Sequence, residues 1–369
     1  MVPKLCLTGG PCAGKTTALA YVAERLADRG FTPLIVPEAA TLLMNGNAAP
    51  PMWGERAFQT AVMRTVINLE QSYEEMANAR PDLNPILLCD RGIVDSRAYI
   101  SEELYLDILR DVGIGFHIDA RDRRYTAVFH LVSAAKDAEE FYTTDNNPVR
   151  RESLTEARLA DDRTLDAWIG APHLRVIGNE TDFSSKLARL DQEICAALGL
   201  PVPIEIERKF LCAPIGPKEL PSAAQRIDIE QVYLLSEPDV VARVRKRGQN
   251  GSYVYFRTEK RFIANGINAE TEHPISAEEY EWSLQFRRPD RRILRKTRTC
   301  FVHANQYFEL DVIPTEDSGV IHLLEIELTR ENQEIKLPPF LKIIADVTDD
   351  HRYTNLMLAA KTTRQTALV

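Results

Sequence analysis

The sequence lacks any arrangement of cysteines that would suit a structural metal site or a disulfide framework. Its six cysteines stand apart along 369 residues, and no two of them form a CxxC pair. Thiols scattered in this way are typical of a reduced, intracellular protein. We therefore expect free cysteines and a cytoplasmic location.

Long apolar runs and an excess of basic charge are also missing. No run approaches the roughly 18 apolar residues that a membrane-spanning helix needs, so no transmembrane segment is expected. The net charge of −9 argues against general nucleic-acid binding, which usually relies on basic residues. A hydrophobic content of 44% with 27% charged residues is typical of globular domains.

The chain changes character near residue 200. Its length favours two domains, and it contains no internal repeat or low-complexity tract. The stretch 199-GLPVP-203 is rich in residues that disfavour regular structure. We therefore predict a first domain at 1–199, a linker at 200–203 and a second domain at 204–369.

Short apolar strands alternate with helical stretches in the first domain. Strands are predicted at 4–9, 33–37, 86–90, 126–133 and 173–178, and helices at 15–29, 54–79 and 183–198. This alternation predicts a three-layer α/β domain with a mostly parallel sheet.

The second domain contains runs of alternating charged and apolar residues. Its predicted strands cover 204–211, 240–247, 252–261, 269–275, 293–301, 306–313 and 322–329, and its short helices cover 276–286 and 354–361. So many antiparallel strands in a domain of this size predict an antiparallel β-barrel of α+β type.

The segment 9-GGPCAGKT-16 matches the phosphate-binding loop motif G-x-x-x-x-G-K-[ST], between a predicted strand and a predicted helix. Backbone amides and the helix N-terminus favour phosphate there. Lys15 can reach the β- and γ-phosphates, and Thr16 can ligate Mg²⁺. The predicted nucleotide contacts, to ATP or GTP, are Gly9, Gly10, Pro11, Cys12, Ala13, Gly14, Lys15, Thr16 and Thr17.

Three charged residues follow predicted strands at the same edge of the first sheet. Asp90 ends the strand at 86–90, where open α/β sheets bind ligands, and is a candidate magnesium ligand. Arg91 follows it as a further catalytic candidate. Glu38 follows the strand at 33–37 and can accept a proton from a substrate hydroxyl. The alternative for Glu38 is a capping role at the next helix.

Basic residues also mark the predicted helix in 150-RRESLTEARLADDR-163. In kinases this region is a lid, and Arg150, Arg151 and Arg158 would then stabilise charge on the phosphates. The alternative is a solvated helix with i,i+4 ion pairs. Asn179, after the last strand, is a candidate contact to the purine.

These motifs together resemble one branch of the P-loop ATPases. The set 9-GGPCAGKT-16, 90-DRG-92, the arginine-rich segment and 178-GNETDF-183 is similar to the nicotinamide-riboside-kinase-like branch, over roughly residues 1–199. The resemblance implies nucleotide binding and leaves the phosphate acceptor open.

Charged side chains recur on one face of the strands in the second domain. In 203-PIEIERKFL-211, Glu205, Glu207 and Lys209 share a face because side chains alternate along a strand. The same alternation pairs Arg243 with Arg245, Thr258 with Lys260, Glu270 with Glu272, Lys296 with Arg298, Glu309 with Asp311, and Glu325 with Glu327.

The opposite face of these strands is apolar, so the charged faces converge if the sheet closes. A bore lined by both signs is costly unless its charges are paired or meet ions. Acidic pairs suit divalent cations, and Lys and Arg suit phosphate oxygens. The alternative is a sheet with one solvated face.

This pattern resembles the CYTH family, the triphosphate tunnel metalloenzymes. The likeness rests on 205-EIERK-209, 294-LRKTR-298, 309-ELD-311, 325-EIE-327 and 346-DVTDDHRYTN-355, and spans about 204–360. It implies an eight-strand tunnel that hydrolyses a triphosphate with Mg²⁺ or Mn²⁺.

Carried over by position, the resemblance assigns roles to the charged residues. Glu205, Glu207 and Lys209 are catalytic candidates. The metal-side candidates are Glu205, Glu207, Glu309, Asp311, Glu325 and Glu327, and the triphosphate-side candidates are Lys209, Arg243, Arg245, Lys260, Lys296 and Arg298.

The order of the two domains resembles the TRPL-translocation-defect protein family, which is described as binding GTP and phosphoinositides. Two functions therefore stay open. One is a bifunctional enzyme that acts on a nucleoside triphosphate and on a second triphosphate. The other is a GTP-binding regulator whose tunnel holds phosphoinositide head groups without cleaving them.

Overall fold

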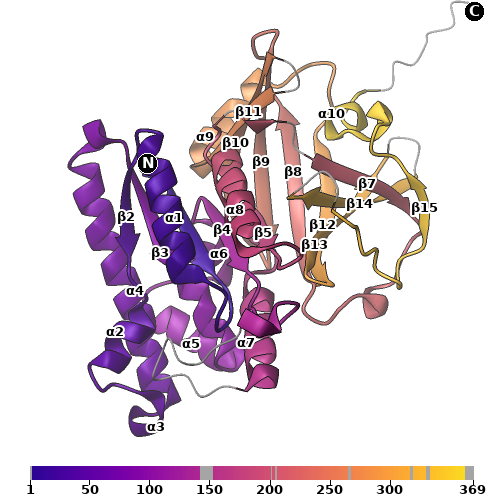
Figure 1. Ribbon diagram of the computed structural model, residues 1–369. Helices are drawn as coiled ribbons and strands as arrows, with labels where there is room; N and C mark the ends of the chain where they lie inside the picture. Colours follow the sequence, from indigo (N-terminus) through magenta and orange to yellow (C-terminus); the bar gives the residue numbers. More distant parts are fainter. Residues whose placement is uncertain are drawn as a thin grey trace, which may run out of the picture. The chain divides into compact units, whose positions relative to one another are not determined.

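The computed structural model divides the chain into two compact units, Met1–Ile194 and Cys195–Val369 (Figure 1). All six cysteines are free thiols. The residues that the structure describes are 2–141, 153–200, 202–203, 206–264, 267–315, 319–329 and 333–361.

The N-terminal unit is built on a parallel five-stranded sheet in the order β2-β3-β1-β4-β5. Its strands are β1 (Lys4–Thr8), β2 (Thr32–Val36), β3 (Pro85–Asp90), β4 (Ala127–Leu131) and β5 (Leu174–Ile177). Every residue of β1 and β4 is buried. These strands read as continuous apolar runs because helices cover both faces of a parallel sheet.

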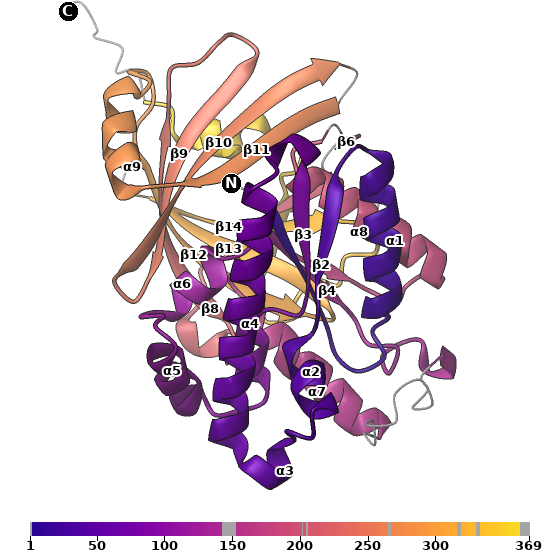
Figure 2. The same ribbon diagram turned by 90° about the vertical axis from the view of Figure 1, so that its left-hand side faces the viewer.

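Helices flank this sheet on two sides, which confirms the predicted α/β architecture. In Figure 2 the sheet lies between α4 (Glu55–Asn78) on one side and α1 (Lys15–Asp28) and α8 (Phe183–Ala197) on the other. The remaining helices of the unit are α2 (Ala39–Asn45), α3 (Pro50–Trp53), α5 (Glu102–Asp111), α6 (His117–Asp122) and α7 (Leu154–Trp168). Among the described residues, no helix combines the length and apolar character required to cross a membrane.

The C-terminal unit contains one large antiparallel sheet, in the order β15-β7-β14-β13-β12-β8-β9-β10-β11-β6. Its strands are β6 (Val202–Pro203), β7 (Ile206–Cys212), β8 (Gln225–Tyr233), β9 (Val240–Gln249), β10 (Ser252–Ala264), β11 (Ile267–Ile275), β12 (Leu294–His303), β13 (Gln306–Pro314), β14 (Val320–Leu328) and β15 (Ile343–Asp346). The helices α9 (Ala277–Ser283) and α10 (Asn355–Leu358) complete the unit.

The large sheet curls, so that β7 and β14 run across the direction of β8 and β9 (Figure 1). Its pairings form a single row from β15 to β6, and within the described ranges no pairing joins the two ends. The predicted antiparallel sheet is therefore present, whereas closure into a barrel stays a prediction.

One face of this sheet is apolar over β7, β12, β13 and β14. Phe210, Phe301, Phe308 and Leu324 belong to a buried cluster there, together with Leu341. The rings of Phe301 and Phe308 stack at a centroid distance of 5.7 Å. This packing holds the strands together from the side opposite to their charged residues.

A buried carboxylate ties α4 to the sheet of the N-terminal unit. Glu70 accepts hydrogen bonds from Lys4 Nζ at 2.9 Å, from an Arg124 Nη at 2.6 Å and from the Tyr125 hydroxyl at 2.6 Å. Its side chain is 1% exposed, so each of these donors replaces water that the carboxylate has lost.

Replacing Glu70 by Gln should destabilise the N-terminal unit by about 3 kcal/mol, because it leaves buried cationic partners without their counter-charge. The matched control is Glu74→Gln. Glu74 also pairs with Lys4 but is 38% exposed, and we expect a loss of about 1 kcal/mol or less. Denaturant unfolding followed by tryptophan fluorescence, to which the buried Trp168 contributes, measures both variants. Equal losses in the two would contradict this account.

Candidate functional site

The predicted phosphate loop joins β1 to α1 in the N-terminal unit. Gly9 and Gly14 have φ of 143° and 81°, which side chains rarely tolerate. A Cβ on Gly9 would lie 2.2 Å from the carbonyl oxygen of Leu131, and one on Gly14 would lie 2.7 Å from the ring of Phe183. The loop is thus held in a fixed, tightly packed conformation.

Lys15 is the first residue of α1 and is buried beneath the loop. Its Nζ donates to the carbonyl oxygens of Gly9 at 3.0 Å and Gly10 at 3.1 Å. Burial, reinforced by the nearby Arg91, lowers the pKa of Lys15 to about 8. Thr16 and Thr17 follow it on the exposed side of the first helical turn.

Asp90 lies at the carboxyl end of β3, beside the loop. The register places it opposite Leu7 of β1. Its Oδ1 is buried and has no hydrogen-bond partner among the described residues. Burial raises the pKa of Asp90, and Lys15 opposes this shift. An unsatisfied carboxylate oxygen at this position fits a bound cation or its water ligand.

Glu38 precedes α2 at the same edge of the sheet, and the structure pairs it with Arg91. Arg91 Nε donates to Glu38 Oε1 at 2.7 Å, and the Thr41 hydroxyl donates to Oε2 at 2.7 Å. Burial pushes the pKa of Glu38 upward, but Arg91 and Lys15 outweigh it and lower the pKa. Glu38 occupies the N-cap position, although its side chain makes no hydrogen bond to the helix backbone.

Sequence reasoning missed a third carboxylate in this cluster, beside Glu38 and Asp90. Asp95 lies in the short 3₁₀ segment Ile93–Ala98, accepts a hydrogen bond from the Thr8 hydroxyl, and pairs with Arg91 at 3.2 Å. Its position three residues after Gly92, whose backbone amide it binds at 2.8 Å, was the available signal. Arg91, with φ of 68°, is thus held between two carboxylates.

The remaining predictions of the N-terminal site have different outcomes. Arg150 and Arg151 lie outside the described residues. Arg158, on α7, donates from Nε to the Ala135 carbonyl at 2.6 Å and pairs with Glu139. Asn179 donates to the carbonyls of Ser133 at 2.8 Å and Lys136 at 2.7 Å, and accepts from Lys186. The amide of Asn179 therefore braces the neighbouring loop.

In the C-terminal unit, the charged side chains of β7, β12, β13 and β14 form one buried network. Arg298 binds Asp311 at 2.7 and 2.6 Å and Glu325 at 2.8 Å, and also pairs with Glu309. Lys296 contacts Asp311 at 2.5 Å. Burial would raise the pKa of Asp311, but Arg298 and Lys296 hold it well below its usual range.

Lys209 extends this network to β7. Its Nζ lies 2.9 Å from Glu325 and 2.7 Å from Glu207. Burial alone would lower the pKa of Lys209, but these two carboxylates raise it above its ordinary value.

A second, more basic group lies on β9, β10 and β11. Arg243 pairs with Glu270 at 3.1 Å and Arg245 lies 3.6 Å from Glu272. Lys260 approaches Glu270 at 3.6 Å. The Nε atoms of Arg243 and Arg245 are buried without a hydrogen-bond partner in the described part of the chain. These guanidinium groups retain donors for an anionic ligand.

The acidic residues predicted to bind metal lie mainly on β7 and β14. Glu207 and Glu327 are directly opposite each other in the register of these strands. Burial and the neighbouring Glu325 raise the pKa of Glu207 to about 7. Glu205 lies outside the described residues, and within them no three acidic, histidine or cysteine side chains gather closely enough to hold a metal ion.

β8 was not predicted from the sequence, although it alternates regularly. Ile227 and Ile229 lie opposite Arg298 and Lys296 in the register with β12, so here the apolar residues share the charged face. Both isoleucines are buried. In the sequence, β8 alternates charged and apolar residues as the predicted strands do, and the reversal of its two faces appears only in the register with β12.

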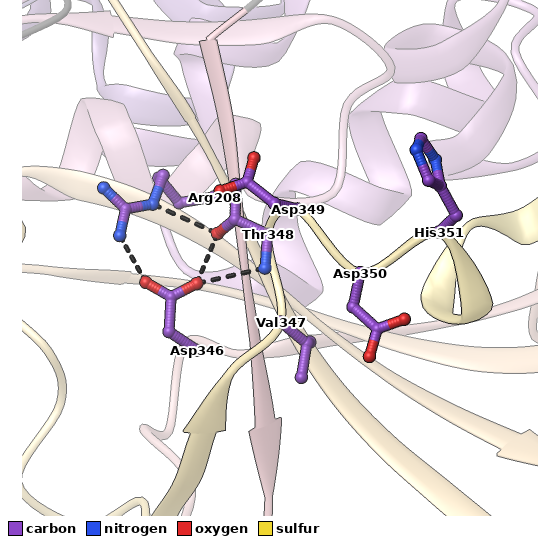
Figure 3. Close-up of a pocket in the computed structure, with 7 residues that line it drawn as sticks. All are labelled: Arg208, Asp346, Val347, Thr348, Asp349, Asp350 and His351. Atoms are coloured by element: carbon purple, nitrogen blue, oxygen red, sulfur yellow. Dashed lines mark hydrogen bonds and ion pairs between the residues drawn. The ribbon is translucent and has the colours of Figure 1, made fainter.

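A pocket of about 810 Å³ opens on the other side of β7, beside the segment that follows β15 (Figure 3). Arg208 pairs there with Asp346 and donates to the Thr348 hydroxyl at 3.1 Å. Side chains alternate along β7, so Arg208 points away from Lys209. This pocket is therefore distinct from the charged face, and its lining consists of Arg208, Asp346, Val347, Thr348, Asp349, Asp350 and His351.

Comparison with solved structures finds matches over less than half of the chain, at low overall similarity. A crystal structure of an inorganic triphosphatase is 29% identical, with a TM-score of 0.33, and the match covers 44% of this chain and 97% of that chain. A protein from Bacillus halodurans described as an adenylate cyclase is 17% identical, with a TM-score of 0.27, covering 35% of this chain and 82% of that chain. A Hippeastrum protein described as an adenylyl cyclase with a dominant triphosphatase activity is 15% identical, with a TM-score of 0.24, covering 34% and 80%.

Comparison with protein families concerns the N-terminal part. No protein with a curated description matches the chain significantly. Residues 4–186 match the family model of an AAA domain. The N-terminal unit is therefore similar to an AAA domain over most of its length.

Proposed function

We propose that the protein is a bifunctional phosphate-handling enzyme. The N-terminal unit binds ATP or GTP and hydrolyses it or transfers its terminal phosphoryl group. The C-terminal unit hydrolyses a triphosphate with the help of a divalent cation. The observation that carries the proposal is the buried network of Lys209, Lys296, Arg298, Asp311 and Glu325 on one sheet face.

In the N-terminal unit, Lys15 and the loop amides hold the phosphate chain. Thr16 and Asp90 would hold Mg²⁺, which neutralises charge on the phosphates when bound. The unsatisfied Asp90 Oδ1 supports this assignment. Phosphoryl transfer, as the resemblance to the nicotinamide-riboside-kinase-like branch implies, would use Glu38 as the proton acceptor after its pairing with Arg91 loosens.

In the C-terminal unit, charged side chains of the sheet would take the place of water around a bound triphosphate. Lys209, Arg243, Arg245, Lys260, Lys296 and Arg298 would hold the phosphate oxygens. Glu207, Glu325 and Glu327 would move closer together than the structure shows them and, together with Glu205, would hold Mg²⁺ or Mn²⁺. The cation polarises the phosphoryl group and activates water when bound.

Energetics support a ligand that carries both cation and anion into this network. Buried ion pairs seldom stabilise a fold more than apolar packing of similar volume. The sheet nevertheless holds Asp311 fully buried between Lys296 and Arg298. When a metal–triphosphate complex binds, the cation can take the place of the basic partners of the carboxylates, and the phosphates can take the place of the acidic partners of Lys and Arg. No buried charge is then left without a partner. The resemblance of residues 204–360 to the triphosphate tunnel metalloenzymes supports the same function.

Lys15→Ala should weaken binding of a fluorescent ATP or GTP analogue and reduce phosphate release from the nucleotide by about 100-fold, since it removes a charged donor to the phosphates. Arg80→Ala is a suitable control because Arg80 is exposed and pairs only locally with Asp82. Unchanged nucleotide binding in Lys15→Ala would remove this half of the proposal.

Arg245→Gln should reduce release of phosphate from tripolyphosphate by about 100-fold in the presence of Mg²⁺ or Mn²⁺, because it removes a charged donor from the site. The matched control is Lys246→Gln on the same strand. Lys246 points to the opposite face, where its Nζ lies 4.3 Å from the centre of the Tyr253 ring. Equal effects of the two substitutions, or no turnover by the wild-type protein, would contradict a hydrolytic role of this face.

Glu207 should make cation binding depend on pH. Its carboxyl group titrates near pH 7, so the affinity for Mn²⁺ should rise by about tenfold between pH 6 and pH 8 as the proton leaves. Glu207→Gln should abolish this dependence, whereas Glu281→Gln on the exposed face of α9 should preserve it. Calorimetric titration with Mn²⁺ measures the affinity.

The same pKa has an opposite effect on stability. Because the folded-state pKa of about 7 lies above the ordinary value of 4.5, the stabilising contribution of the protonated carboxyl group is full below about pH 4.5 and is lost as the pH rises through 7. Without metal, Glu207→Gln should therefore unfold at a higher temperature than the wild-type protein at pH 8. A lower unfolding temperature there would show that Glu207 is a structural residue.

A further inference from the structure

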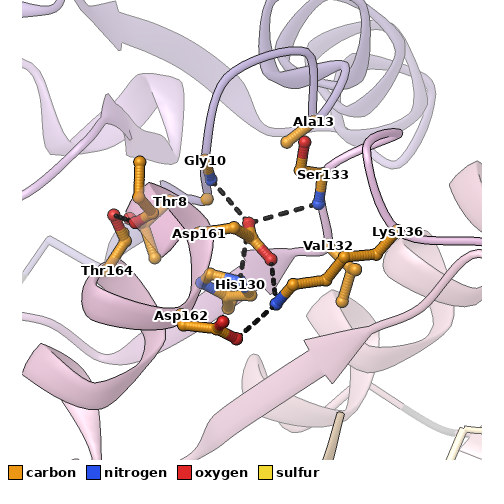
Figure 4. A network of polar contacts seen from close by, with 12 residues as sticks. Thr8, Gly10, Ala13, His130, Val132, Ser133, Lys136, Asp161, Asp162 and Thr164 are labelled. Carbon is orange, nitrogen blue, oxygen red and sulfur yellow. Dashed lines mark hydrogen bonds and ion pairs between the residues drawn. The ribbon is translucent and has the colours of Figure 1, made fainter. Parts of the chain in front are cut away.

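Asp161 is a buried carboxylate on α7 that sequence reasoning did not single out. It reaches the phosphate loop, where it accepts a hydrogen bond from the Gly10 backbone N–H at 2.8 Å (Figure 4). The same oxygen lies 3.2 Å from the Ser133 backbone nitrogen and 3.2 Å from His130 Nε2. Its other oxygen lies 2.8 Å from Lys136 Nζ.

The loop and α7 touch directly at this point. A Cβ added to Gly10 would lie 2.6 Å from the Cβ of Asp161, so no other residue fits here without displacement. The Gly10 peptide cannot rotate without losing a hydrogen bond to a charged acceptor, the stronger class of hydrogen bond.

Other contacts hold the loop along its length. The Ser133 hydroxyl donates to the Pro11 carbonyl, and the Ala134 backbone N–H donates to the Cys12 carbonyl at 3.2 Å. Lys186 Nζ lies 3.5 Å from the Ala13 carbonyl and donates to the Val132 carbonyl at 2.7 Å. The three contacts to the loop are made to its carbonyl oxygens, whereas Asp161 is a carboxylate that accepts a hydrogen bond from a loop amide.

The surroundings of Asp161 keep it ionised. Burial would raise the pKa of this carboxyl group, but His130 and Lys136 outweigh burial and hold it well below its usual range. His130 and Asp161 are both fully buried. The carboxylate is therefore ionised at neutral pH and accepts the hydrogen bond of the Gly10 amide.

We propose that Asp161 is a positioning residue of the nucleotide site, which fixes the Gly10 peptide and thereby the conformation of the phosphate loop. This inference rests on the proposed nucleotide binding of the N-terminal unit. Its structural consequence is specific: the Gly10 amide is committed to Asp161, so the donors to phosphate come from the later residues of the loop and from Lys15.

The test compares Asp161→Asn and Asp161→Leu with Asp162→Asn in the full chain. Asp162 is the matched control, because it also binds Lys136 Nζ, at 2.7 Å, but is 56% exposed and is not a contact of the loop amide. Asn keeps an acceptor oxygen without the charge, and Leu removes the acceptor. Two quantities are measured: hydrogen exchange of the Gly10 amide without nucleotide, and the affinity for a fluorescent ATP analogue with Mg²⁺.

We expect Gly10 exchange to accelerate in the order wild type, Asn, Leu, and the affinity to fall in the same order. Loss of a hydrogen bond to a charged group corresponds to about tenfold or more in affinity, and Asp162→Asn should change it less than twofold. If the Leu variant does not fold, the Asn variant decides.

The outcomes separate the two hypotheses. Wild-type exchange and wild-type affinity in Asp161→Asn would overturn the positioning role. Suppose that Gly10 exchange accelerates in the Asp161 variants but the wild-type protein binds no nucleotide analogue. This result would overturn the proposed nucleotide binding and would leave the contact between Asp161 and the loop established. Equal losses of affinity in Asp161→Asn and Asp162→Asn would also overturn the positioning role, because the shared partner is Lys136.

Discussion

Burial of opposite charges on one face of a curled β-sheet is the constraint on which the C-terminal unit depends. Desolvating a single carboxylate or ammonium group costs several kcal/mol, and the cost is recovered only by close partners of opposite sign. Asp311 has two such partners, and Glu325 joins Arg298 to Lys209. The apolar cluster around Phe301 and Phe308 supplies packing on the opposite face of the sheet, so the charged face is not the main source of its stability.

Under the proposed function, the two units would bind phosphate in physically different ways. The N-terminal unit would use backbone amides, a helix N-terminus and one buried lysine, so its specificity for phosphate would come from the conformation of a short loop. The C-terminal unit would use side chains from several strands, whose charges depend on register and on mutual pairing. A single substitution is therefore expected to act locally in the loop and through several partners in the sheet.

Much of this organisation follows from sequence patterns. Period-two alternation predicted seven strands of the C-terminal unit, and the phosphate-loop motif predicted the junction between β1 and α1. The strand β8 was missed although its sequence alternates in the same way, and the placement of Ile227 and Ile229 on the face that is charged elsewhere is visible only in the structure. Closure of the sheet depends on how its ends meet, which alternation does not determine.

The limits of sequence reasoning at the N-terminal site have a similar cause. Asp95 and Asp161 act through contacts with residues distant in the sequence, Thr8 and Gly10. The spacing between Gly92 and Asp95 marks only the local contact of Asp95, and no local motif marks the distant ones. Asn179 stands at the predicted edge of the sheet, but the carbonyls of Ser133 and Lys136 engage its amide. Position along the chain predicted the neighbourhood of these side chains and not their partners.

The central claim is that the buried charged face receives a metal–triphosphate complex. The most direct measurement is a crystal structure of the protein with Mn²⁺ and a non-hydrolysable tripolyphosphate analogue, with anomalous scattering locating the metal. The account predicts Mn²⁺ at Glu205, Glu207, Glu325 and Glu327, with the last three side chains closer together than in the structure without ligand, and phosphates on Arg243, Arg245, Lys296 and Arg298. Intact pairs between Arg298, Asp311 and Glu325 with the analogue bound elsewhere, or not at all, would contradict it.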